Sequence, residues 1–138
     1  MLAHPISASI ARRCVGRTLT AWGRADLVEC AQLIIGELVA NAIQSTADVT
    51  AAGADLVAPG GLVESQPGVV GVGLYRIGGR VVLEVWDRSR LPPKLVNPSM
   101  EDVGGRGLLL VDALATVWGY RLSAIGGKVV YATLDEAA

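Results

Sequence analysis

The hydrophobic pattern of this chain changes its period once, and this change limits the fold. Up to about residue 46 the apolar residues recur at helical spacing, whereas from Val69 onward they alternate in strand-like runs. The glycine pairs Gly78-Gly79 and Gly126-Gly127 separate these runs in the manner of hairpin turns. Strands joined by such short turns run antiparallel, and helices can then cover one face of their sheet. The pattern predicts an α+β fold, a two-layer α/β sandwich with a mainly antiparallel mixed sheet and helices on one face.

Helix and strand signals follow one another in a definite order. Ser7 is a candidate cap for a first helix that runs to about Trp22. Asp26 is a candidate cap for the second helix, with Glu29 as its capping-box partner. The apolar run LLLVDALA after Gly107 indicates a third helix. The strands are expected at residues 69–77, 80–86, 116–123 and 128–134.

The stretch from Ala47 to Gly68 differs from its surroundings. It contains small residues, two prolines and four glycines, and it has no sustained period. Such a composition is typical of a loop. A connection of this length inside a domain is uncommon and is either functional or mobile. We therefore expect one domain over residues 1–138, with a flexible insertion at about 47–68.

The composition indicates a folded chain without a strong charge bias. Apolar residues make up 51% of the 138 residues, charged residues make up 18%, and the net charge is −1. This balance gives no support to a nucleic-acid or anionic-membrane partner. The sequence has no run of about 18 apolar residues, and its first residues lack a signal-peptide core. We expect a cytoplasmic protein without a direct nucleic-acid or membrane partner.

The cysteines and the histidine are poor candidates for chemistry. Cys14 and Cys30 lie in apolar helical contexts without a CxxC spacing. They are expected to be buried reduced thiols rather than a disulfide or a metal site. His4 precedes Pro5 near a terminus, so we do not expect it to act as a catalytic base or a phosphate acceptor.

Two polar residues interrupt the apolar period of the segment Gln32–Ser45. Glu37 and Asn41 are four residues apart, so on a helix their side chains stack one turn over the other beside the apolar stripe. A carboxylate and an amide held in this way can receive a hydrated metal ion or a water molecule. The alternative is the solvated edge of an ordinary helix.

A carboxylate at a strand end and a glycine-rich loop are the other two candidate features. Asp87 follows the second predicted strand, where open α/β sheets commonly bind ligands, although an aspartate there can also form a turn. Gly104, Gly105, Arg106 and Gly107 lead directly into the third predicted helix. Glycines at a helix N-terminus let backbone N–H groups approach a phosphate, and the helix dipole favours the anion. An ordinary glycine-rich turn is the competing explanation.

In this order, the three features resemble the ATP-binding domain of the GHKL (Bergerat-fold) superfamily, which includes histidine kinases, gyrase and the anti-sigma-factor serine kinases. The segments ELVANAI, EVWDRSRLPP, GGRGLLLVDALATVWG and GGKVVYATL are similar to the small stand-alone histidine-kinase-like ATPase domains of actinobacteria, which are related to those serine kinases. The resemblance covers nearly the whole chain apart from Ala47 to Gly68. It implies a Bergerat-type ATPase fold with ATP and Mg²⁺ as ligands.

The resemblance also implies a role for each candidate residue. Asn41 would coordinate the Mg²⁺ that bridges the ATP phosphates, and Glu37 would orient or deprotonate the attacking hydroxyl or water. Asp87 would accept a hydrogen bond from the adenine amino group. In the glycine-rich loop, Arg106 would add positive charge near the phosphates or lie exposed. The backbone amides that would meet the phosphates belong to Gly104, Gly105 and Gly107.

Three functions are compatible with this resemblance. The favoured one is an anti-sigma-factor-type kinase, an ATP-dependent protein serine/threonine kinase or weak ATPase that binds a sigma factor and phosphorylates an antagonist protein. The alternative is a non-catalytic partner-switching module on the same fold. An autophosphorylating histidine kinase is disfavoured, because the sequence shows no dimerisation-and-phosphotransfer helical hairpin and its only histidine is His4.

Three arginines of the first predicted helix raise the question of a protein partner. Arg12, Arg13 and Arg17 fall mainly on the side opposite to the apolar stripe. If the chain is a kinase of this type, they are candidates for a homodimer or partner surface. A solvated helix face is the alternative.

Overall fold

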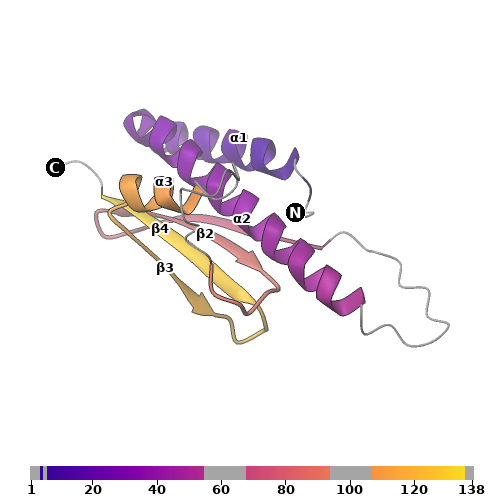
Figure 1. Cartoon of the computed structure of the whole chain (residues 1–138). Coiled ribbons are helices and arrows are strands. Elements are labelled where there is room, and N and C mark those ends of the chain that lie inside the picture. Colours follow the sequence, from indigo (N-terminus) through magenta and orange to yellow (C-terminus); the bar gives the residue numbers. More distant parts are fainter. Residues whose placement is uncertain (1–3, 5, 55–67, 94–106, 136–138) are drawn as a thin grey trace.

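The computed structural model describes residues 4, 6–54, 68–93 and 107–135, and it is an α+β structure (Figure 1). The four strands form one sheet in the order β1-β2-β4-β3, and every described strand pair is antiparallel. The helices lie together on one side of this sheet (Figure 1). The elements are α1 (Ile6–Ala21), the 3-10 turn η1 (Ala25–Leu27), α2 (Val28–Ala54), β1 (Gly71–Ile77), β2 (Arg80–Asp87), α3 (Gly107–Leu114), β3 (Val117–Leu122) and β4 (Lys128–Asp135).

The predicted α+β class with helices on one face is confirmed, and one detail of the sheet is refined. The turns at Gly78-Gly79 and Gly126-Gly127 connect β1 to β2 and β3 to β4, as predicted. The sheet was expected to be mixed, but the four described strands contain no parallel pair. The reason is that β2 and β4, which are distant in sequence, also pair in antiparallel register.

The hydrophobic core lies between the helices and one face of the sheet. Alternate residues of β2 and β4 point toward α2, and every third or fourth residue of α2 meets them, while the buried residues of α1 pack against α2. Full burial of a Val, Leu or Ile side chain contributes about 1.5–3 kcal/mol, so this contact is the main source of stability. Its buried members are Ala11, Val15, Leu19, Ala31, Ile34, Ile35, Leu38, Val39, Ala42, Val70, Val81, Leu83, Val85, Leu108, Val111, Val130, Ala132 and Leu134.

The second helix is longer than the sequence pattern predicts. A loop was expected from Ala47 onward, but α2 continues through Ala54. The added turns are rich in alanine, the best helix former, and contain no proline. Local helix propensity therefore extends the helix beyond the point where the amphipathic period fades. The rest of the predicted insertion, residues 55–67, lies outside the described residues.

The two predicted helix caps are also wrong. α1 begins one residue before Ser7, and His4 accepts its first hydrogen bonds, from Ile6 N–H at Nδ1 (3.2 Å) and from Ser7 N–H at its carbonyl oxygen (2.8 Å). Asp26 lies within η1 and forms an ion pair with Arg24 (2.9 Å) instead of capping α2. At α1 the residue His4 thus accepts the first N–H groups of the helix, and at η1 the Asp26 carboxylate is engaged by the Arg24 guanidinium.

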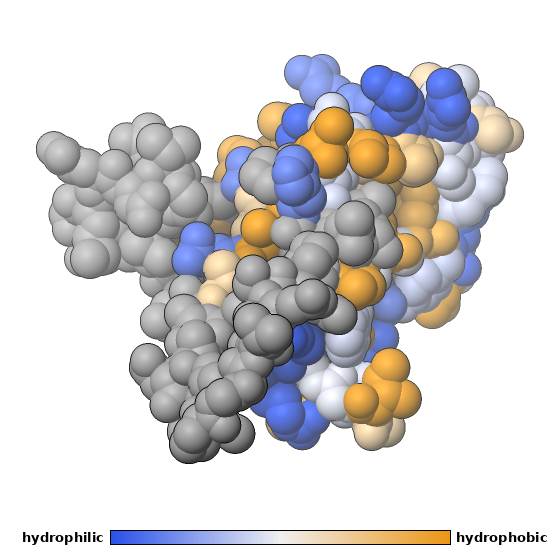
Figure 2. Space-filling view, turned by 90° about the vertical axis from the view of Figure 1, so that its right-hand side faces the viewer, coloured by the Kyte–Doolittle hydropathy of each residue, from blue (hydrophilic) through white to orange (hydrophobic). Residues whose placement is uncertain are grey.

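The outer surface of the helical layer is mixed, with charged side chains beside the exposed apolar residues Ile6, Ile10 and Leu33. Figure 2 shows hydrophilic side chains gathered at the top of the molecule, which is the helical side. Arg12, Arg13 and Arg17 are exposed on α1, in agreement with the predicted solvent-facing side. Cys14 is also exposed there, where a buried thiol was predicted, while Cys30 is partly buried. Among the described helices, none combines the length and the apolar composition that a membrane crossing needs.

A close backbone contact joins the β3–β4 turn to the end of β2. Gly126 and Gly127 both have positive φ, 101° and 74°, a region that disfavours side chains. A Cβ atom at Gly127 would run into the carbonyl oxygen of Asp87, whereas a Cβ atom at Gly126 would meet open space. Gly127 therefore allows the turn to lie directly against the last residue of β2.

This difference gives a matched test of the fold. Gly126→Ala and Gly127→Ala should both lose about 1 kcal/mol of unfolding free energy from the positive φ. We expect Gly127→Ala to lose about 1–3 kcal/mol more, because the added methyl group overlaps the Asp87 backbone. Urea unfolding of the two variants measures the difference. Equal losses would show that the turn does not pack against β2 in this way.

Candidate functional site

A buried ion pair stands at one end of the sheet. Asp87 is the last residue of β2 and Lys128 is the first residue of β4, and the two face each other in the strand register. Lys128 Nζ lies 2.9 Å from Asp87 Oδ1, and both side chains are 0% exposed. Because side chains alternate along a strand, Asp87 shares the face of Leu83 and Val85, which is the face that the helices cover. The predicted site residue Asp87 is thus buried inside the fold, and it also forms a turn, because its carboxylate accepts the backbone N–H of Ser89 two residues later.

The two oxygens of the Asp87 carboxylate have different surroundings. Oδ1 accepts hydrogen bonds from Lys128 Nζ and from the backbone N–H of Ser89, at 2.9 and 2.8 Å. Oδ2 is buried and has no hydrogen-bond partner among the described residues. Ser89 is itself fixed, because its hydroxyl oxygen accepts the N–H of Leu91 (3.2 Å). The described hydrogen bonds therefore hold the carboxylate through Oδ1, and Oδ2 remains as a hydrogen-bond acceptor.

Burial and pairing act on the Asp87 pKa in opposite directions. Burial raises the pKa of this carboxyl, because removal from water penalises its charged form. The hydrogen bond and the charge of Lys128 lower the pKa, and the Ser89 N–H lowers it further. Burial is the larger effect, so the pKa lies above its usual range. The charged state of Asp87 consequently depends on Lys128.

The second predicted feature, the polar pair on α2, occupies the middle of that helix. Glu37 and Asn41 are both half-buried, one turn apart, beside the buried residues that pack on the sheet. Asn41 Oδ1 is buried and has no hydrogen-bond partner within the described part of the chain. A buried amide oxygen without a partner is costly and uncommon in folded proteins. Asn41 is therefore more than a solvated position on a helix edge.

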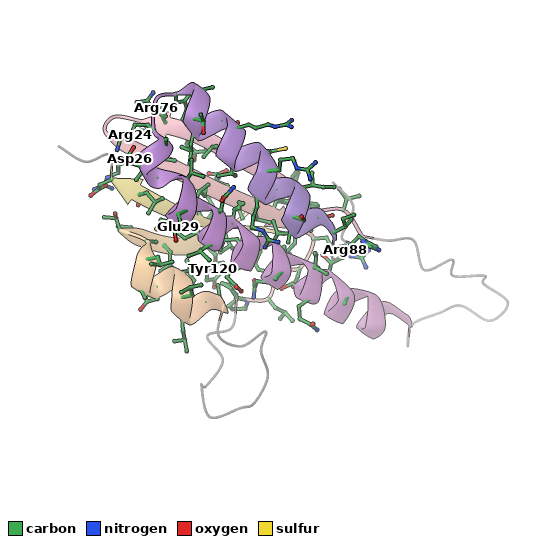
Figure 3. The ribbon with its side chains drawn as sticks, turned by 90° about the horizontal axis from the view of Figure 1, so that it is seen from above. Arg24, Asp26, Glu29, Arg76, Arg88 and Tyr120 are labelled. Carbon is green, nitrogen blue, oxygen red and sulfur yellow. The ribbon has the colours of Figure 1, made fainter. Side chains whose placement is uncertain are left out.

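The ion pair and the polar pair belong to elements that pack on each other. α2 contacts β2 through the core, and β2 ends on the side of the sheet that the second half of α2 covers (Figure 1). Figure 3 shows Arg88, the residue after Asp87, on this side of the molecule. Among the described residues, neither Glu37 nor Asn41 forms a hydrogen bond or ion pair with Asp87. The elements α2 and β2, which carry the polar pair and the ion pair, therefore pack on each other without a described hydrogen bond between the two pairs.

The third feature is described only at its end. Gly104, Gly105 and Arg106 lie outside the described residues, and Gly107 is the first residue of α3. The apolar side of α3, with Leu108 and Val111 in the core, packs against α2. The helix predicted directly after Gly107 is confirmed, and the phosphate-binding role of the glycine-rich loop stays a prediction.

Lys128 is a residue of this site that no sequence motif indicated. A lysine that opens an apolar strand is a weak signal, because most lysines are exposed. Its partner is 41 positions away, and α3 and β3 lie between them in the chain. Within the described residues, no group of three or more His, Cys, Asp or Glu side chains could hold a metal ion. Asn41 Oδ1 remains the oxygen ligand that fits the predicted magnesium position.

The ion pair predicts a pH-dependent effect of Lys128→Met. This variant leaves the Asp87 carboxylate buried without a counter-ion, which costs about 3–5 kcal/mol of unfolding free energy at neutral pH. The Asp87 pKa in the folded variant then lies further above its unfolded value, so the folded state binds the extra proton more tightly. Stability should therefore rise as pH falls, and urea unfolding at pH 8 and pH 5 should show a smaller loss at pH 5.

A neutral double variant provides the control for this prediction. Asp87→Asn combined with Lys128→Met contains no buried charge at this position, so its unfolding free energy should lack the rise from pH 8 to pH 5 that Lys128→Met shows. If Lys128→Met loses the same unfolding free energy at both pH values, Lys128 does not control the pKa of the Asp87 carboxyl.

Comparison with known proteins adds no functional assignment. No protein-family model matches the chain, and no curated protein matches it either. The resemblance to the GHKL superfamily stays a prediction from the ordered motifs. Function is therefore argued below from the described geometry.

Proposed function

We propose that this protein binds ATP and acts as an anti-sigma-factor-type serine/threonine protein kinase of the GHKL (Bergerat-fold) superfamily. The observation that carries the proposal is the Asp87 carboxylate, which is fully buried and has one oxygen without a hydrogen-bond partner among the described residues. A negatively charged acceptor that is buried away from water suits the amino group of a nucleobase. Adenine carries such a donor on its six-membered ring. Guanine has an acceptor at the same position, which a carboxylate repels.

The α2 pair supports the phosphate side of the same proposal. Asn41 Oδ1 is a buried neutral oxygen with no hydrogen-bond partner in the described part of the chain, which fits one ligand position of a Mg²⁺ ion whose other ligands are waters and phosphate oxygens. When bound, Mg²⁺ would offset the negative charge of the phosphates. Glu37 lies one turn earlier on the same helix and is half-buried. It is the group that would orient the acceptor hydroxyl and take its proton during phosphate transfer.

Nucleotide binding is tested first by titration calorimetry of ATP, with and without Mg²⁺. Wild type should bind ATP more tightly with Mg²⁺ present. In Asn41→Ala this Mg²⁺ dependence should disappear, with a loss of about 1.5–3 kcal/mol, the scale of a contact with a charged group. Leu33→Ala, at an exposed position two turns earlier on α2, is the matched control and should bind as wild type does. Wild type that does not bind ATP would overturn the proposal.

Catalysis is tested separately with Glu37→Gln, which keeps the size of the side chain and removes its charge. We expect ATP binding within about twofold of wild type and phosphate transfer to an antagonist protein reduced by about 10²- to 10⁴-fold. Transfer of labelled γ-phosphate in a single turnover measures the difference. If wild type binds ATP and a partner but transfers no phosphate, the protein is a partner-switching module and not a kinase.

A further inference from the structure

We propose that Lys128 is a positioning residue that sets base selectivity: by occupying Oδ1 of Asp87, it leaves Oδ2 as a single acceptor for an adenine-type amino group. This inference deepens the proposed function and rests on it. It concerns a residue that the sequence motifs did not assign, and it stands on the geometry of the buried ion pair.

The burial of a lysine at this position costs free energy. Lysine is among the residues least often fully buried, yet the Lys128 side chain is 0% exposed. Replacing a buried ion pair by apolar residues is often neutral or stabilising, so such a pair is weak evidence for a stabilising role. The pair is better explained by what it does to the Asp87 carboxylate.

The two oxygens of the Asp87 carboxylate offer a limited number of hydrogen-bond acceptor positions. A carboxylate can receive two parallel N–H donors, one on each oxygen. In this protein Lys128 Nζ and Ser89 N–H both use Oδ1, and only Oδ2 lacks a partner within the described residues. A carboxylate oxygen has about two acceptor positions, so Ser89 N–H alone would leave one on Oδ1 open, and Lys128 Nζ fills it. Oδ2 is then the oxygen that remains for a ligand.

Adenine and guanine present different hydrogen-bond donors to a carboxylate. Adenine presents one amino group as a donor, next to a ring nitrogen that accepts. Guanine presents two neighbouring donors, its ring N–H and its amino group, which match both oxygens of a free carboxylate. With Oδ1 engaged, the guanine edge would keep one buried donor unpaired, and sites of this kind discriminate strongly against such a mismatch. The Lys128 contact therefore favours ATP over GTP.

The strength of Asp87 as a hydrogen-bond acceptor depends on its negative charge. Lys128, on the strand next to β2, is the charged group that acts on Asp87, and neither α2 nor α3 adds a second one among the described residues. Burial alone raises the pKa of Asp87, and a protonated carboxyl would lose its strength as an acceptor. Lys128 therefore also maintains nucleotide binding as the pH falls.

The test compares wild type, Lys128→Met and the matched control Arg121→Met. Arg121 forms an ion pair with Glu84 (3.0 Å) but is half exposed and lies on the other face of the sheet. Dissociation constants for ATP and GTP are measured by calorimetry at pH 6, 7 and 8.5, and each variant is divided by wild type at the same pH, so that protonation of the nucleotide cancels.

For Lys128→Met we expect the ATP-to-GTP preference to fall about tenfold or more. We also expect its ATP affinity relative to wild type to be lowest at pH 6 and to recover toward pH 8.5, as Asp87 ionises. Arg121→Met should show neither change. A Lys128→Met variant with the wild-type preference and a pH-independent ratio would overturn the inference and leave ATP binding intact. Wild type that binds neither nucleotide would overturn the proposed function as well.

Two further measurements keep the test decisive if Lys128→Met does not fold. Lys128→Arg keeps the charge and a donor and should retain the preference for ATP. In wild type, the ammonium resonance of Lys128, protected from exchange by burial, should persist when ATP is added. Loss of this signal on binding would mean that ATP displaces Lys128 from Asp87, which would contradict the single-acceptor arrangement.

Discussion

The structure depends on one apolar contact, the seating of α2 on the central strands β2 and β4. These strands supply the middle of the sheet, and their buried residues meet Ile34, Ile35, Leu38 and Val39 of the helix. α1 and α3 both pack against α2, so the helical layer is organised around it. The same contact determines the orientation of the polar pair: once Leu38 and Val39 face the sheet, Glu37 and Asn41 must lie at the edge of the contact. The placement of the candidate site is thus a consequence of core packing.

Asp87 and Lys128 extend this apolar layer with charges. Each continues the inward-facing set of its strand, at a position where an apolar residue would remove the cost of burying a charge. The two charges offset each other, and Ser89 N–H adds a hydrogen bond, but Oδ2 remains without a described partner. An arrangement optimised only for stability would satisfy both oxygens or contain none. This incomplete satisfaction is the physical reason for regarding the end of the sheet as a binding position.

Local signals predicted much of the fold, and contacts between distant residues explain what they missed. The Gly-Gly turns and the change of period predicted both hairpins and the α+β class, because these depend on neighbouring residues. The caps at Ser7 and Asp26 were wrong because His4 accepts the first N–H groups of α1 and because the Arg24 guanidinium binds the Asp26 carboxylate. Asp87 and Asn41 were predicted from motif order, but Lys128 was not. Its importance comes from the register between β2 and β4, which no local sequence signal determines.

The buried pair also changes how Asp87 must be studied. An asparagine at position 87 would remove the charged acceptor and, in the same step, leave the Lys128 ammonium buried without its counter-ion. A loss of nucleotide binding in that variant would therefore combine a lost ligand contact with a damaged fold. Only changes made at both positions, or at Lys128 while Asp87 is kept, separate the two effects. The structural role and the proposed binding role of Asp87 belong to different oxygens of one carboxylate, and for this reason its partner Lys128 is the more informative residue to change.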